Sequence, residues 1–260
     1  VLFPEGVVSR ANDRLNPLME GVALIARSAA KRRAAQTPAG QVVVLPVALR
    51  YSFQGNLAAT VSPVLARIEQ RLSWREQRDL PLPERIKKLG EALLGLKETE
   101  YLGSSQQGPI FERLERLTNH LLAPIEAEYL HGAPEPGVVQ RVKKMRSAIL
   151  PDMIHGELPA AERERRWRQL ADLYLAQQLA FYPANYVGAG SNPDRILETV
   201  ERLEEDLTDV SQVHPPMKVI ATVGEPIAVS PVRERGADHD PLMTNLETQL
   251  CDMLGIDHGN

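Results

Sequence analysis

The sequence predicts an α/β protein that is interrupted by a large, all-helical insertion. Short apolar, valine-rich runs lie near both ends of the chain, at residues 42–49 and 217–229. The stretch between them is charged, rich in leucine and repeatedly apolar at helical spacing. We therefore divide the chain into an α/β domain of residues 1–51 and 216–260 and a helical insertion of residues 52–215.

Composition excludes several classes of function. The 260 residues suffice for one large domain or two small ones, and 43% of them are apolar. A net charge of −4 and an aromatic content of 5% give no basis for nucleic-acid binding. The single cysteine, Cys251, cannot form a disulfide within the chain. The six histidines are scattered without metal-ligand spacing, so no metal site is expected.

The first part of the chain has the pattern of a strand–helix–strand unit. Val1–Phe3 is interpreted as the end of a buried strand, and Val42–Leu49 as a second strand, buried and parallel to the first. Between them, residues at helical spacing predict a helix that ends before a break at Thr37–Gly40. The apolar residues of this helix are Leu18, Val22, Ile25 and Ala29.

The middle and last parts are predicted from apolar spacing and from breaks at proline and glycine. We expect five or six helices in the insertion, packed as a bundle or as hairpins. Met217–Val223 is expected to be a strand, Ile227–Val229 a second short strand, and Pro241–Leu254 a terminal helix. The apolar stripes of the insertion are Val61/Leu65/Ile68/Leu72, Ile110/Leu114/Leu117/Leu121, Val138/Val142/Met145/Ile149, Trp167/Leu170/Tyr174 and Ile196/Val200/Leu203/Leu207/Val210.

Three ordered segments resemble the glycerophospholipid acyltransferase family, which includes 1-acylglycerol-3-phosphate O-acyltransferase. The opening Phe3-Pro4-Glu5-Gly6 matches the start of a family block that reads Phe-Pro-Glu-Gly-Thr-Arg-Ser. Leu45-Pro46-Val47-Ala48-Leu49 resembles the next block, Val-Pro-Val-Ala-Ile. The late Val223-Gly224-Glu225-Pro226-Ile227 resembles the strand pair that follows. The resemblance covers roughly 95 residues in two pieces and implies an α/β fold with a mostly parallel sheet.

The resemblance also implies an activity. It is the transfer of a fatty acyl group from acyl-CoA or acyl-carrier protein to a lysophospholipid or glycerol-phosphate-like acceptor. No bound cofactor is expected, because the thioester donor is itself a substrate. A cytoplasmic protein in peripheral contact with a membrane would suit such substrates. The alternative is a non-catalytic, acyltransferase-like scaffold whose helical insertion mediates binding or assembly.

The resemblance assigns substrate binding to the opening block, that is, to Phe3, Pro4, Glu5, Gly6, Ser9 and Arg10. Glu5 would orient the acceptor hydroxyls or a basic neighbour, and Gly6 would let the backbone approach the ligand. Ser9 and Arg10 would hold phosphate. Pro46 and Val47 belong to a structural block near the site. The family's Thr-Arg after Glu-Gly is replaced here by Val-Val. Two alternatives stay open: either Arg10 or Arg14 substitutes for the family's phosphate-contacting arginine, or the acceptor has a different headgroup.

The catalytic pair of the family is absent from these 260 residues. Its general base is a histidine with an aspartate five residues later, and no histidine here has an aspartate at that offset. We therefore expect that an N-terminal part carrying the pair is missing, and that this fragment is inactive alone.

Simpler interpretations stay open for several of these features. Glu5 and Arg10 can form a surface ion pair after a tight turn, and Pro46 can simply end sheet pairing. The loop at 188–192 suggests either a phosphate loop or, with more support, a helix capped by Ser or Asn. The basic stretch from Arg141 to Arg168 suggests either contact with anionic lipid or a solvated helical face.

Overall fold

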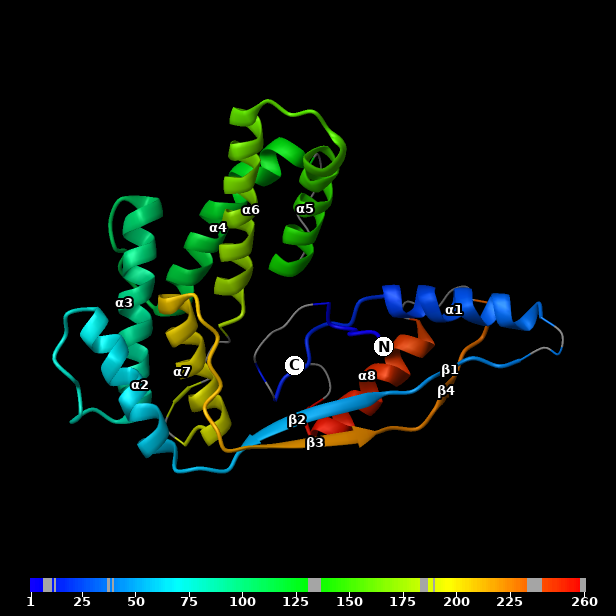
Figure 1. Cartoon of the computed structure of the whole chain (residues 1–260), viewed down its shortest axis with the longest axis horizontal. Coiled ribbons are helices and arrows are strands. Elements are labelled where there is room, and N and C mark those ends of the chain that lie inside the picture. Colours follow the sequence, from blue (N-terminus) through cyan, green and yellow to red (C-terminus); the bar gives the residue numbers. More distant parts are fainter. Residues whose placement is uncertain are drawn as a thin grey trace. The chain divides into compact units, whose positions relative to one another are not determined.

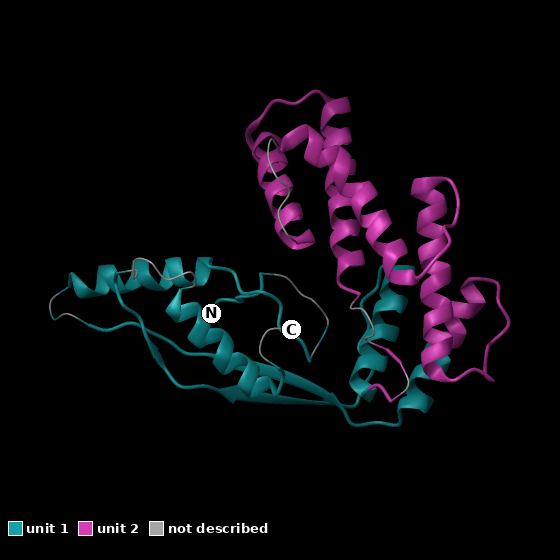
Figure 2. Cartoon of the chain, turned by 180° about the vertical axis from the view of Figure 1, so that it is seen from behind, with its two compact units in different colours: residues 1–64, 192–260 teal, residues 65–191 magenta. Residues whose placement is uncertain are grey.

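A computed structural model describes residues 1–6, 11, 13–36, 38, 40–130, 137–182, 187–188, 190–232 and 240–257. Two compact units divide the chain. Unit 1 consists of residues 1–64 and 192–260, and unit 2 of residues 65–191 (Figure 2). Unit 1 is thus built from two pieces of chain that unit 2 separates in sequence.

Unit 1 contains four helices or parts of helices and four short strands among its described residues. The elements are α1 (Gly21–Ala34), β1 (Val43–Val44), β2 (Val47–Phe53), the first part of α2 (Leu57–Arg71), α7 (Pro193–Thr208), β3 (Met217–Val223), β4 (Ile227–Ala228) and α8 (Pro241–Leu254). The predicted bounds of β3 and α8 are confirmed, and β4 is one residue shorter than predicted. Pro241 at the first turn and a left-handed Gly255 after the last residue explain why both ends of α8 were visible in the sequence.

The predicted mostly parallel α/β sheet is wrong. About 60% of the described residues are helical. The described strands form two small antiparallel sheets of two strands each, β1 with β4 and β2 with β3. In Figure 1 the arrows of β2 and β3 run side by side in opposite directions. Strands that flank the helical stretch therefore pair with each other, across more than 160 residues of sequence.

The opening segment does not supply the strand that a strand–helix–strand unit requires. Val1–Phe3 has no strand partner in the described part of the chain, and the side chains of Val1 and Phe3 are largely exposed. The run at 42–49 is divided at Leu45–Pro46 into β1 and β2. An apolar run looks the same in sequence whether it is a buried parallel strand or, as here, a strand in a small antiparallel sheet with one apolar face exposed.

That exposed face lies on the β2–β3 pair. The register places Val47 opposite Val223 and Tyr51 opposite Val219, and each of these four side chains is roughly half exposed. On the other face Ala48 is buried, because α8 packs against β2. The sheet therefore contributes one face to the core of unit 1.

The core of unit 1 is formed by α1, α8 and the strands. Leu242, Leu246 and Leu250 of α8 are buried together with Ile227 of β4. From α1 the buried residues are Val22, Ala23, Ala26 and Ala30. Ile25, predicted to face the core, is 53% exposed. Small alanines let α1 approach its neighbours closely, which a search for large apolar residues does not detect.

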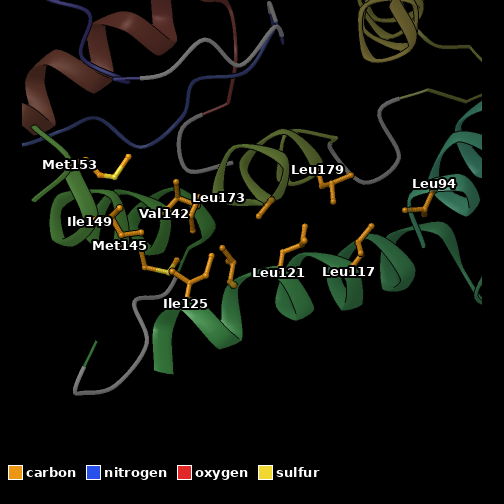
Figure 3. Packing of buried hydrophobic residues seen from close by; sticks show 12 residues of the cluster. Leu94, Leu117, Leu121, Ile125, Val142, Met145, Ile149, Met153, Leu173 and Leu179 are labelled. Carbon is orange, nitrogen blue, oxygen red and sulfur yellow. The ribbon is translucent and has the colours of Figure 1, made fainter. Parts of the chain in front are cut away.

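Unit 2 is entirely helical among its described residues. It contains the end of α2 together with α3 (Leu82–Leu102), α4 (Ile110–Tyr129), α5 (Val138–His155) and α6 (Ala160–Ala180). Figure 3 shows its core, where side chains from α3, α4, α5 and α6 point toward one another. Leu117, Leu122, Met145, Ile149 and Leu173 are completely or almost completely inaccessible. The predicted stripes on α4 and α5 are confirmed by this burial.

The predicted face of α6 is not its core face. Trp167 and Tyr174 are 60% and 57% exposed, while Leu173, Ala176 and Leu179 are buried. Charged residues dominate the first half of α6, so few apolar residues mark its core face. The prediction therefore relied on the large aromatic side chains, which lie on another face. None of the helices in the described ranges has an apolar stretch long enough for a bilayer.

Candidate functional site

Phe3–Gly6 forms a tight turn that is fastened to the chain just before α1. The Gly6 amide donates a hydrogen bond to the carbonyl oxygen of Phe3 at 3.2 Å, and the Met19 amide donates to that of Pro4 at 2.8 Å. Glu5 Oε2 accepts two hydrogen bonds from Asn16, one from the backbone amide at 2.9 Å and one from Nδ2 at 2.8 Å. The carboxylate of Glu5 thus holds the turn and the segment before α1 together.

Gly6 is required by the geometry of this turn. Its φ is +68°, a conformation that side-chain-bearing residues rarely adopt. A Cβ atom at this position would also collide with the sulfur of Met19. The glycine therefore serves the backbone conformation and the close approach of Met19.

Only part of the predicted substrate-binding block can be placed. Phe3 is exposed and Pro4 is partly buried, next to Glu5 and Gly6. Ser9 and Arg10, together with the Val7-Val8 pair, lie outside the described residues. The predicted proximity of Glu5 and Arg10 is therefore neither supported nor contradicted.

The second and third of the three segments that resemble the family meet directly. The carbonyl oxygen of Pro46 accepts a hydrogen bond from the Gly224 amide at 2.9 Å, and Val47 is paired with Val223. Beyond the turn, the Glu225 amide donates to the side-chain oxygen of Gln249 in α8 at 2.8 Å. Pro46 and Val47 thus sit where the two pieces of unit 1 are joined.

A polar pocket of about 280 Å³ lies within unit 1. Three arginines line it, and each comes from a different element: Arg14 from the segment before α1, Arg50 from β2 and Arg195 from α7. The remaining lining residues are Asp13, Leu15, Asn192, Glu247, Cys251, Leu254, Gly255, Ile256 and Asp257. Glu5 is not among them.

One arginine of this pocket is held by a carboxylate. Arg195 Nε donates to Asp13 Oδ2 at 2.5 Å. The other oxygen of the same carboxylate, Asp13 Oδ1, is buried and accepts no hydrogen bond from any described residue. An ionised carboxylate oxygen without a donor is costly, so this atom marks a position where a donor group is favourable.

The start of α7 forms one side of the pocket. The side chain of Asn192 caps this helix by accepting a hydrogen bond from the Asp194 amide at 2.9 Å. In the loop before it, the Gly188 amide donates to Ser191 Oγ at 2.7 Å. These contacts confirm the capping interpretation of the 188–192 loop.

Other chemistry in unit 1 is limited. No three His, Cys, Asp or Glu side chains in the described ranges come together as a metal site. Burial, together with the nearby carboxylates of Glu247 and Asp252, raises the pKa of the Cys251 thiol. A thiol with a raised pKa is protonated at neutral pH, so Cys251 is a poor nucleophile.

Comparison of this chain with protein families, curated proteins and solved structures finds no match. The resemblance of the three blocks therefore rests on their own residues and order. Sequence reasoning did not find the pocket, because Arg50 and Arg195 are separated along the chain by the whole of unit 2. The only visible signal was Arg50, which directly follows an apolar run in β2.

Proposed function

We propose that unit 1 is the acceptor-binding part of an O-acyltransferase. The acyl group would pass from acyl-CoA or acyl-carrier protein to a lysophospholipid or glycerol-phosphate-like acceptor. One observation carries this proposal: the segments that resemble separate family blocks, far apart in sequence, are hydrogen-bonded through Pro46 and Gly224 in one compact unit. A chance likeness of short motifs would not require them to meet.

In this proposal the chain binds the acceptor but does not catalyse the transfer. Acylation of a hydroxyl needs a general base, and no histidine of this sequence has the family's aspartate five residues later. The base would be supplied from outside these 260 residues. Cytoplasmic location and peripheral contact with a membrane belong to the same proposal, since acceptor and donor carry acyl chains.

A non-catalytic scaffold is the second candidate, and one observation favours it. Asn16 already occupies Glu5 Oε2 with two hydrogen bonds, as expected for a purely structural turn. In the enzyme proposal the second oxygen, Oε1, and the exposed Phe3 remain for the acceptor. The two candidates therefore differ in whether the Phe3–Gly6 turn binds a lysophospholipid.

Isothermal titration of the purified chain with lysophosphatidate below its critical micelle concentration tests this difference. We expect saturable binding that Glu5→Gln weakens about tenfold, which corresponds to the loss of one charge-assisted contact. Glutamine can still accept both hydrogen bonds from Asn16, so the turn is kept. Glu115→Gln, an exposed carboxylate of α4, is the matched control and should bind like the wild type.

No binding by the wild type, or equal binding by Glu5→Gln, would leave the scaffold as the better proposal. In a separate assay the same chain should not transfer a labelled acyl group from acyl-CoA. Turnover by the purified chain would contradict the assignment of the general base to a part outside it.

A further inference from the structure

The pocket of unit 1 is lined by side chains of both charges. Its volume of about 280 Å³ lies just below the roughly 300–1,000 Å³ that small-molecule sites span. Of its lining side chains, only Leu15, Leu254 and Ile256 are aliphatic. An acyl chain would find little apolar surface there, so the pocket differs in chemistry from a lipid-tail site.

The three arginines give the pocket its preference for an oxyanion. Guanidinium groups match the geometry of phosphate oxygens and stay charged at every physiological pH. Arg50 is exposed, and among the described residues its Nη1 donates one long hydrogen bond, to the Leu254 carbonyl oxygen at 3.4 Å, so it can turn toward a ligand at little cost. Arg195 is oriented by Asp13 and therefore presents a fixed edge.

Asp13 adds the opposite preference. Its Oδ2 is engaged by Arg195, while its buried Oδ1 receives no hydrogen bond from the described residues. Glu247 and Asp257 also line the pocket, so three carboxylates accompany the three arginines. A ligand that places an ammonium group against these carboxylates would gain charge-assisted contacts with them.

We propose that this pocket binds a small phosphomonoester that also carries an ammonium group. Its phosphate lies against Arg14, Arg50 and Arg195, and its ammonium group lies against the carboxylates of Asp13, Glu247 and Asp257. The site does not involve the Phe3–Gly6 turn, so a test of ligand binding in this pocket is independent of the acyl-transfer proposal.

Isothermal titration of the purified chain with three matched probes tests the assignment. O-Phosphoethanolamine carries both groups, inorganic phosphate only the anion, and ethanolamine only the ammonium. We expect O-phosphoethanolamine to bind saturably and about tenfold more tightly than phosphate, with no binding of ethanolamine, because each charge-assisted hydrogen bond contributes about a factor of ten. No binding of O-phosphoethanolamine, or equal binding of it and phosphate, would overturn the proposal.

Two variants test the contacts of the phosphate and of the ammonium group separately. Arg50→Gln should weaken O-phosphoethanolamine and phosphate by similar factors. Asp13→Asn, which keeps an acceptor for Arg195, should weaken only O-phosphoethanolamine and remove its advantage over phosphate. Arg168→Gln, an arginine of α6 with a side chain 72% exposed, is the charge-matched control. Unchanged O-phosphoethanolamine binding by both pocket variants, with their circular dichroism spectra intact, would also overturn the assignment.

Discussion

Glu98 is a completely buried charged residue of unit 2. Arg113 binds both of its oxygens, with Nε at 2.9 Å and Nη2 at 2.6 Å. The Gln106 amide donates a further hydrogen bond to Oε2 at 2.8 Å. Burial alone would raise the pKa of Glu98, but the hydrogen bonds from Arg113 and Gln106 lower it below its ordinary value. The carboxylate is thus buried in its charged form.

Removing Arg113 should therefore be severe. Arg113→Ala leaves the Glu98 carboxylate buried without its cation, which typically costs about 3–5 kcal/mol. Urea unfolding followed by circular dichroism measures this loss. Arg168→Ala, at a largely exposed arginine, should cost less than about 0.5 kcal/mol. A loss below 1 kcal/mol for Arg113→Ala, relative to this control, would show that the pair contributes little to stability.

The same arrangement recurs between successive helices. Arg85, Arg113 and Arg141 each occupy the fourth residue of a helix, in α3, α4 and α5. Each binds a glutamate near the end of the preceding helix, 16, 15 and 15 residues earlier in the chain. The glutamates are Glu69, Glu98 and Glu126. An arginine–glutamate pair thus fastens each of these three helix junctions.

These junctions make unit 2 sensitive to acid. The folded-state pKa values of Glu69, Glu98 and Glu126 are all lowered from an ordinary 4.5. A carboxylate with a lowered pKa contributes stability that is complete above its unfolded pKa and is lost as pH falls through the folded pKa. We therefore expect the melting temperature of unit 2 to be constant from pH 7 to about 5 and to decrease steeply below about 4.5.

A pH series of thermal melts checks this expectation. In Arg113→Ala the junction of α3 and α4 has lost its cation, so the pKa of Glu98 is no longer lowered by Arg113, and the hydrogen bond from the Gln106 amide remains to oppose the effect of burial. The melting temperature of that variant should therefore fall less steeply below pH 4.5 than that of the wild type. Parallel pH profiles for the two proteins would contradict the role given to the pair.

The sequence predicts some elements well because their signals are local. The bounds of α8 follow from its proline and glycine, and those of β3 from its alternating, β-branched residues. The buried pairs escaped sequence reasoning, because a glutamate near one helix end and an arginine in the next helix look like ordinary solvated charges. Their common position, four residues into each helix, was the signal that could have revealed them.

Features that depend on contacts between distant segments could not be predicted, because the sequence signals used are local. β2 pairs with β3, although unit 2 separates these strands in the sequence. The residues of Val47–Phe53 alone do not indicate which strand they pair with. Within the opening block the local part was accessible, since Gly6 has the positive φ that a close turn requires. The pocket was not, because Arg14, Arg50 and Arg195 come together only through the tertiary fold.

At the scale of the whole molecule, the two units have separate hydrophobic cores. The core of unit 2 includes Leu117, which is completely buried, and that of unit 1 includes Leu246, which is 4% exposed. None of the buried residues in either cluster belongs to the other unit. Cooperative unfolding follows shared burial, so each unit has its own basis for a cooperative transition.

We therefore expect two transitions in differential scanning calorimetry, and core variants that move them one at a time. Truncation of a buried leucine costs about 2–5 kcal/mol, which lowers the melting temperature of a domain of this size by roughly 10 °C. Leu117→Ala should lower the transition of unit 2 and leave that of unit 1 unchanged, while Leu246→Ala does the reverse. Because the variants are matched in chemistry, each serves as the control for the other. A single transition that both variants lower equally would mean that the two cores unfold together, and that unit 2 supports the pocket and the Phe3–Gly6 turn through the stability of the whole chain.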